Sequence, residues 1–174
     1  GLGDVYKRQG PLRVDNEKMS KSLDNFFTVR EVLKSYSPEV IRYLLISSHY
    51  RSPINYSEQS LQQSAKALER VYIGLKGLEL KSAKSLTNSR YERAYFEAMD
   101  DDFNTGAACS DLFELVRELN KFADQQHLDD PQQRDETHLA SFTQGMTTLR
   151  EHASLLGLFW QKPSATASRD DQLD

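Results

Sequence analysis

Apolar side chains recur at alternating intervals of four and three residues over most of this 174-residue chain. After Ser57, for example, the repeating positions are Leu61, Ala65, Leu68, Tyr72 and Leu75. This spacing places the side chains on one stripe of a long α-helix, whereas a strand would show a two-residue period. Because such a stripe has to be buried, the chain is constrained to a fold in which helices pack on helices.

Three further segments are predicted to be amphipathic helices. One begins at a capping box formed by Ser89 and Glu92, one follows Asn104 and Thr105, and one runs from about residue 134 to residue 158. Their apolar positions are Tyr91, Ala94, Tyr95, Ala98 and Met99; Ala108, Leu112, Leu115, Leu119 and Phe122; and Leu139, Phe142, Met146, Leu149, Ala153 and Leu156. Four such helices, joined by loops of about 4 to 12 residues, predict an antiparallel up-down four-helix bundle.

Two shorter helices are predicted before the bundle. Thr28 and Glu31 have the spacing of a capping box, which predicts a short helix that begins at Val29. Ser37 followed by Pro38 is a second start signal, for a helix that ends near residue 48. Residues 11–25 are interpreted as a loop, and "HYRSPINYS" is too interrupted for regular structure. No strand is expected, so the predicted fold class is all-α.

Composition limits the environment and the partners. With 38% hydrophobic residues, the chain can bury one substantial core. Cys109 is the single cysteine, which excludes a disulfide framework and a pair of thiolates for a structural zinc, and fits a cytoplasmic location. No apolar run approaches the roughly 20 residues that cross a membrane. The net charge of -4 means that any RNA contact should be local.

The chain offers few candidates for catalysis. The acidic run from Asp100 to Asp102 is interpreted as a solvated helix end, because consecutive carboxylates on a helix point in different directions. The four histidines have no partner at ligand spacing, so no metal site is expected. What remains is a pair of lysines, Lys18 and Lys21, with a hydroxyl beside each, in the stretch "KMSKS". This stretch could close on a polyanion.

The same stretch, Lys18 to Ser22, matches the ATP loop of class I aminoacyl-tRNA synthetases letter for letter. "SPEVIRYLLIS" resembles the segment that follows this loop in several members of the class. "SHYRSPINYSEQSLQQSAKALERVY" and "AMDDDFNT" resemble the cysteinyl-tRNA synthetase family specifically. The resemblance extends from about Leu12 to Trp160 and favours this family over synthetases for other amino acids.

The resemblance implies a division of the chain into parts. Residues 11–56 would be the end of a catalytic domain with its stem-contact segment, and residues 57–160 a helical bundle of the DALR type. Residues 1–10, which show no helical or alternating pattern, are interpreted as an unrelated or scar-like tail or as the stub of a truncated upstream region. Residues 161–174 are interpreted as a disordered tail or the start of a further domain. The chain would then be a fragment, inactive alone in cysteine-dependent ATP–pyrophosphate exchange.

The resemblance also implies the roles of individual residues. ATP would be bound by the five residues of the loop, with Lys21 as the catalytic residue at the phosphates: Lys18, Met19, Ser20, Lys21 and Ser22. An ammonium at that position would stabilise the charge that develops on departing pyrophosphate. The cofactor would be ATP with Mg²⁺, and the other partners cysteine and tRNA(Cys). Zinc is expected only in an upstream catalytic domain, and the enzyme is expected to be a monomer without membrane contact.

Two positions depart from the family pattern. Asp24 stands where glycine is usual after "KMSKSL", and its carboxylate is unfavourable near a triphosphate. Gly106 stands where proline is usual after "DDDFNT", which removes a residue that would pre-set the first helical turn. A different class of protein, a non-enzymatic helical adaptor that contains "KMSKS" by chance, remains the alternative.

Overall fold

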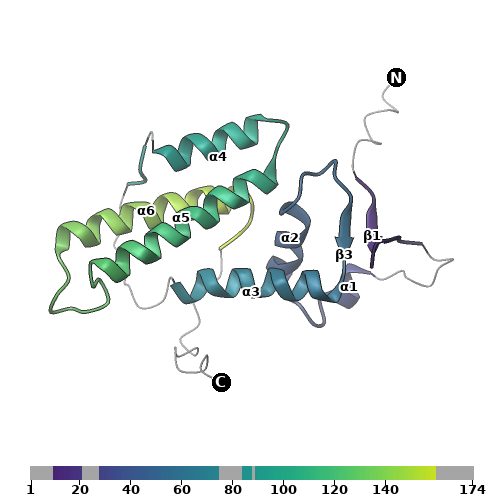
Figure 1. Ribbon diagram of the computed structural model, residues 1–174, viewed down its shortest axis with the longest axis horizontal. Coiled ribbons are helices and arrows are strands. Elements are labelled where there is room, and N and C mark those ends of the chain that lie inside the picture. The colour runs from purple at the N-terminus through teal and green to yellow at the C-terminus, as the bar shows by residue number, and fades with distance from the viewer. Residues whose placement is uncertain (1–9, 21–27, 75–83, 88, 160–174) are drawn as a thin grey trace.

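The computed structural model describes residues 10–20, 28–74, 84–87 and 89–159 (Figure 1). These ranges contain three strands and six helices: β1 (Leu12–Val14), β2 (Glu17–Lys18), α1 (Val29–Val32), α2 (Pro38–Ile46), β3 (Ile54–Tyr56), α3 (Glu58–Gly74), α4 (Arg90–Asp100), α5 (Thr105–Gln125) and α6 (Glu136–Leu155). The predicted helical fold class is confirmed. Within the described ranges, no helix is long and apolar enough to span a membrane.

The helices begin where the sequence places their capping residues. Thr28 and Glu31 form the predicted capping box. The Thr28 hydroxyl accepts a hydrogen bond from the N–H of Glu31, and the Glu31 carboxylate accepts one from the N–H of Thr28. The Ser37 hydroxyl accepts a hydrogen bond from the backbone N–H of Val40, and Pro38 occupies the first turn of α2. The Ser89 hydroxyl accepts one from the N–H of Glu92 in the same way. Each cap satisfies a backbone donor that would otherwise have no partner within the helix.

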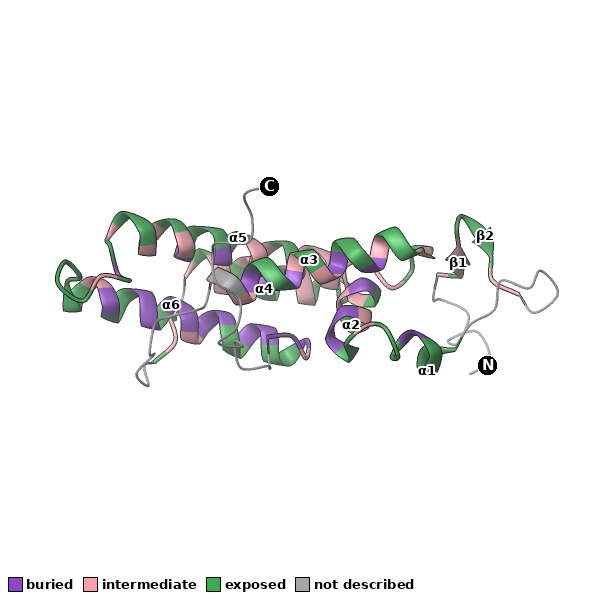
Figure 2. Ribbon diagram, turned by 90° about the horizontal axis from the view of Figure 1, so that it is seen from below, coloured by how far each residue is buried: buried purple, intermediate pink, exposed green. Residues whose placement is uncertain are grey.

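The buried core is continuous from α2 and α3 to α4, α5 and α6. Helices α4, α5 and α6 pack on one another, while α3 packs mainly against α2 and also contacts α5 (Figure 1). Figure 2 shows buried residues recurring along α6. The predicted stripes supply the core, because Leu61, Leu112 and Leu149 are all buried. The up-down order of a four-helix bundle stays a prediction, since α3 is shared between α2 and the other helices.

A small sheet precedes the bundle, so the expectation that the chain has no strands is wrong. The strand order is β2-β1-β3. A hairpin joins β1 to β2 through Asp15 and Asn16, both with positive φ as a two-residue hairpin turn requires, and β1 also pairs in parallel with β3. The strands have only two or three residues each, so they are too short for an alternating apolar pattern to reveal them.

Gly10, the last residue of the tail predicted for residues 1–10, lies against the loop that precedes β3. Its N–H donates a hydrogen bond to the carbonyl oxygen of Tyr50 over 2.8 Å. A Cβ at this position would lie 2.0 Å from the backbone oxygen of Ser52. Only a residue without a side chain fits here.

Gly10→Ala is therefore expected to destabilise the chain by about 1 to 3 kcal/mol, because the backbone has to move to relieve the overlap. Urea unfolding of the 174-residue chain measures the change. Gly145→Ala is the control, since its Cβ would meet only the flexible end of the Leu119 side chain. The gain in helix propensity should offset most of that cost. Equal stabilities of the two variants would contradict the close approach at Gly10.

The chain after α6 is turned back onto α2 and α3. Gly157, at φ +68°, follows the helix, and the N–H of Leu158 donates to the carbonyl oxygen of Ala153 in a Schellman motif. The next N–H, of Phe159, donates to the carboxylate of Glu39, which is 2% exposed. The Tyr72 hydroxyl also donates to that carboxylate. A buried, hydrogen-bonded carboxylate thus links α2, α3 and the end of the described chain.

His152 is a buried histidine between α4 and α6. It is 6% exposed, and its ring stacks on Tyr95 with 4.7 Å between the centroids. Its Nδ1 has no hydrogen-bond partner among the described residues. Burial lowers the pKa of His152, and the opposing influence of Glu92 and Glu151 is weaker.

The bundle should consequently lose stability in mild acid. The folded-state pKa of His152 lies below its unfolded value of about 6.5, so the unfolded chain binds more protons between the two values. The stabilisation is complete above the unfolded pKa and is lost as the pH falls through the folded one. We expect the free energy of unfolding, measured with urea, to fall less between pH 7.5 and pH 5 for His152→Gln than for the unaltered chain. Equal losses would contradict this origin.

Candidate functional site

The β1–β2 hairpin leads directly into the lysine-rich stretch. Its turn is fixed to β3, because the N–H of Asn16 donates to Oδ1 of Asn55 over 2.8 Å and the N–H of Asp15 donates to the oxygen of Tyr56. After β2, the N–H of Met19 donates to the oxygen of Leu12 over 3.4 Å. The start of the stretch therefore leaves the sheet at a defined position.

The structure places part of the predicted site. Lys18 is the last residue of β2 and is exposed, whereas Met19 and Ser20 are half-buried. Lys21 and Ser22 lie outside the described residues, so their approach to Lys18 stays a prediction. Asp24, which departs from the family pattern, lies outside them as well.

Arg13 is a residue that the sequence analysis missed. It lies directly opposite Lys18 across the hairpin, and it is also exposed. Residues opposite each other on antiparallel strands project to the same face, with their Cβ atoms about 5 Å apart. Two positively charged side chains on one face produce a local positive potential that attracts anions. No periodicity in the sequence could reveal this pair, because it depends on the hairpin.

A second group of polar side chains joins the α2–β3 loop to the corner between α4 and α5. This junction cluster consists of His49, Tyr50, Arg51 and Asp102. The Tyr50 hydroxyl donates to Oδ1 of Asp102 over 2.8 Å, and Arg51 Nη2 lies 3.0 Å from each carboxylate oxygen. Arg51 Nε also donates to the Tyr50 hydroxyl, and this hydrogen bond raises the pKa of Arg51 above its usual value. Asp102 is thus not merely a solvated helix end.

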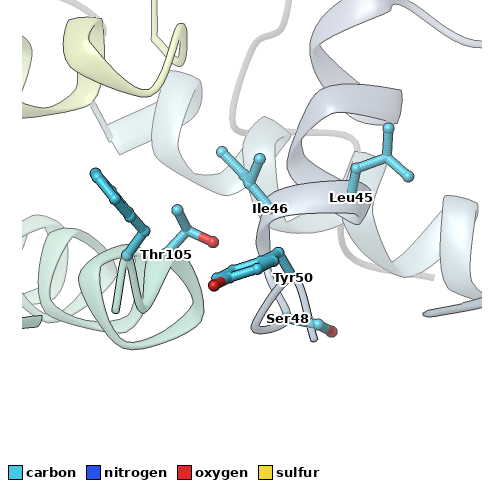
Figure 3. Close-up of a pocket in the computed structure, with 6 residues that line it drawn as sticks. Leu45, Ile46, Ser48, Tyr50 and Thr105 are labelled. Atoms are coloured by element: carbon cyan, nitrogen blue, oxygen red, sulfur yellow. The ribbon is translucent and has the colours of Figure 1, made fainter. Parts of the chain in front are cut away.

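An apolar hollow of about 330 Å³ lies beside the junction cluster (Figure 3). Figure 3 shows Tyr50 from the loop and Thr105 from the start of α5 facing it, with Ile46 from the end of α2. Its remaining lining residues are Leu45, Ser48 and Phe103. Phe103 is 66% exposed and has a φ of +53°, which is unusual for an aromatic residue.

In the described part of the chain, Cys109 does not supply a reactive thiolate and the acidic residues do not form a metal cluster. Cys109 is buried in α5, and burial raises the pKa of its thiol to about 12, so the thiolate required of a nucleophile is not formed near neutral pH. Within the described ranges, no three histidine, cysteine or acidic side chains are grouped so that they could hold a metal ion.

Two family models match separate parts of the chain. The model for the class I (C) tRNA synthetase catalytic domain matches residues 3–66, which include the hairpin, α2 and β3. The DALR domain model matches residues 94–160, from within α4 to beyond α6. The first match also includes residues 3–10, which belong to the predicted tail.

Curated relatives match nearly all of the chain. The cysteine–tRNA ligase of Azotobacter vinelandii is 47% identical over 98% of this chain and 34% of its own length. That of Stutzerimonas stutzeri is 47% identical over 93% of this chain, and that of Klebsiella pneumoniae 45% over 98%. The chain spans about a third of the length of these relatives. Over the segment that it spans, this chain therefore belongs to the cysteine–tRNA ligase family.

Proposed function

We propose that this chain supplies the ATP loop and the tRNA-docking helical bundle of an enzyme that activates cysteine with ATP and transfers it to tRNA(Cys). The observation that supports the proposal best is the position of the "KMSKS" stretch. It begins on β2, an edge strand of the sheet, within the segment that matches the catalytic-domain model. The hairpin holds one end of the loop in place and leaves Lys18 exposed beside Arg13.

The proposed reaction has two steps. A carboxylate oxygen of cysteine attacks the α-phosphorus of ATP, the bond to the bridging oxygen breaks, and pyrophosphate leaves. A terminal ribose hydroxyl of the tRNA then attacks the carbonyl carbon of the adenylate, and AMP leaves. Mg²⁺ bound to ATP would neutralise part of the phosphate charge. Zinc, as the family resemblance implies, would belong to a part of the enzyme upstream of this chain.

In this proposal the lysines act on the first step. Negative charge grows on pyrophosphate as its bond to the α-phosphorus breaks, so the ammonium of Lys21 stabilises the transition state more than bound ATP. Lys18, Met19, Ser20 and Ser22 shape and bind the same loop. Arg13 lies opposite Lys18 on the hairpin and would add a second positive charge to the phosphate-facing side.

The bundle would act on the second step by holding the tRNA. The formal charge of the chain is -4, so the docking surface should be a limited area rather than a broad basic face. The adaptor alternative would need an extended apolar groove on the bundle. The hollow of about 220 Å³ among α4, α5 and α6 and the hollow of about 330 Å³ beside the junction cluster are each local, with few lining residues. We expect the enzyme to act as a monomer in the cytoplasm.

ATP–pyrophosphate exchange with a panel of amino acids tests the proposal. The protein to use is the full-length product of the reading frame that contains this chain. We expect exchange with cysteine and little with serine, alanine or valine. Exchange that depends on another amino acid would support a synthetase of different specificity. A folded protein that shows no exchange with any amino acid would support the adaptor alternative and overturn the proposal.

A further inference from the structure

The two segments that match different family models meet at the junction cluster. His49, Tyr50 and Arg51 belong to the segment matched by the catalytic-domain model, whereas Asp102 belongs to the segment matched by the DALR model. About 50 residues separate the two sides along the chain, and the longest described element between them is α3. The two segments also pack on each other through α2 and α5, and the cluster adds polar contacts at the edge of that packing.

Asp102 contacts every other member of the cluster. Its carboxylate accepts hydrogen bonds from Tyr50 over 2.8 Å and from Arg51 over 3.0 Å, and His49 Nε2 lies 3.6 Å from it. The Tyr50 ring also stacks against His49 and lies under the Arg51 guanidinium, 5.3 Å from its Cζ. All three loop side chains thus converge on one carboxylate.

The backbone at this corner is in an unusual conformation. Asp102 and Phe103 both have a φ of +53°, and the N–H of Asn104 donates to the oxygen of Ala98. Aspartate tolerates the left-handed region, but phenylalanine rarely adopts it. Two successive residues in this region therefore indicate a strained backbone. This corner directs the Asp102 side chain toward the loop while Phe103 stays exposed beside the hollow.

Beside this corner, the start of α5 packs closely against the end of α2. A Cβ on Gly106, in the first turn of α5, would lie 3.0 Å from the backbone oxygen of Ser47 at the end of α2. The departure from the family pattern at Gly106 therefore coincides with a close approach of the two helices. The rings of Tyr43 in α2 and Phe113 in α5 also pack together, with their centroids 5.2 Å apart.

We propose that Asp102 is a positioning residue. Through Tyr50 and Arg51 it fixes the angle between the helical bundle and the segment that carries the ATP loop, and so determines where a docked tRNA presents its 3′ end. The inference rests on the proposed function, because it assumes that the bundle holds the tRNA. Cysteine activation does not involve the tRNA and needs no such alignment.

The contribution of the cluster to folding should be small. Arg51 and Asp102 are both nearly half exposed, and ion pairs at such positions add little to stability. A misplacement of about 1 Å can nevertheless slow a reaction about 100-fold when two reactants have to be aligned. Removing the Asp102 carboxylate is consequently expected to slow tRNA charging while leaving the melting temperature almost unchanged.

The test compares both reaction steps in Asp102→Ala of the full-length protein. At saturating tRNA, we expect kcat for cysteinylation to fall about tenfold, on the scale of a partial loss of alignment, with little change in KM. Cysteine-dependent exchange should stay within about twofold of the unaltered enzyme. Asp102→Asn should restore part of the loss, because an amide oxygen can still accept from Tyr50. Arg51→Ala should reproduce the loss through the other partner.

The control is Glu118→Gln, which removes an ion pair with Arg90 between α4 and α5 and away from the junction cluster. It should leave both steps unchanged. The inference is overturned if Asp102→Ala and Arg51→Ala charge tRNA like the unaltered enzyme, or if exchange and charging fall in parallel. If instead the unaltered enzyme shows no cysteine-dependent exchange, the proposed function itself has failed.

Discussion

Replacing Lys21 by alanine in the full-length enzyme is expected to slow adenylate formation by about 10²- to 10³-fold. This loss corresponds to about 3 to 4 kcal/mol of transition-state stabilisation, the scale of one preorganised electrostatic contact. ATP binding should weaken much less, because the charge that Lys21 would stabilise is small in the resting complex and grows as pyrophosphate departs. Single-turnover measurement of adenylate formation over a range of ATP concentrations separates the two effects.

Two further variants sharpen this prediction. Lys21→Arg should recover only part of the rate, because a planar guanidinium does not replace a compact ammonium on a flexible stem. Asp24→Gly removes a carboxylate from the same loop and should leave the rate unchanged or raise it. If Lys21→Ala retains its single-turnover rate and only its ATP dissociation constant rises, the lysine holds substrate and does not act on the transition state.

Phe142→Ala is expected to have the largest effect on stability, a loss of about 3 to 5 kcal/mol. Phe142 lies in α6, is 2% exposed and shares a hollow with Leu115 and Leu119 of α5. Truncation would remove most of the ring's contacts and leave a cavity that packed helices cannot fill. Urea unfolding of the 174-residue chain, followed by helical circular dichroism, measures the loss.

Leu155→Ala is the matched control for this prediction. It lies on the same helix and also shortens an apolar side chain, but it is 67% exposed. A surface change of this kind should alter the free energy of unfolding by less than about 0.5 kcal/mol. Losses of similar size at the two positions would show that burial in α6 is not the source of stability.

The helices could be predicted because their signals are local. A helix repeats its apolar positions every three or four residues, so α3, α5 and α6 each carry several turns of pattern. Capping residues such as Ser37 and Ser89 act within three residues of themselves. Both signals can be read from a sequence without knowing what the helix packs against.

The sheet and the junction cluster could not be predicted because they depend on contacts between distant residues. Strands of two or three residues contain too few positions to show a period, and β1 pairs with β3 about 40 residues away. The contact of Asp102 with Arg51 likewise joins residues that are 51 positions apart in the sequence. Arg13 became a candidate only once the hairpin register placed it opposite Lys18.

We propose that this chain can replace the corresponding third of a cysteine–tRNA ligase. The most direct test replaces that third of the Azotobacter vinelandii enzyme, to which the chain is 47% identical, and measures cysteinylation of tRNA(Cys) by the chimera. We expect the chimera to charge tRNA, and Lys21→Ala within it to abolish most of that activity. A chimera with the helical content and melting temperature of the parent enzyme, but with neither cysteine-dependent exchange nor charging, would contradict the claim.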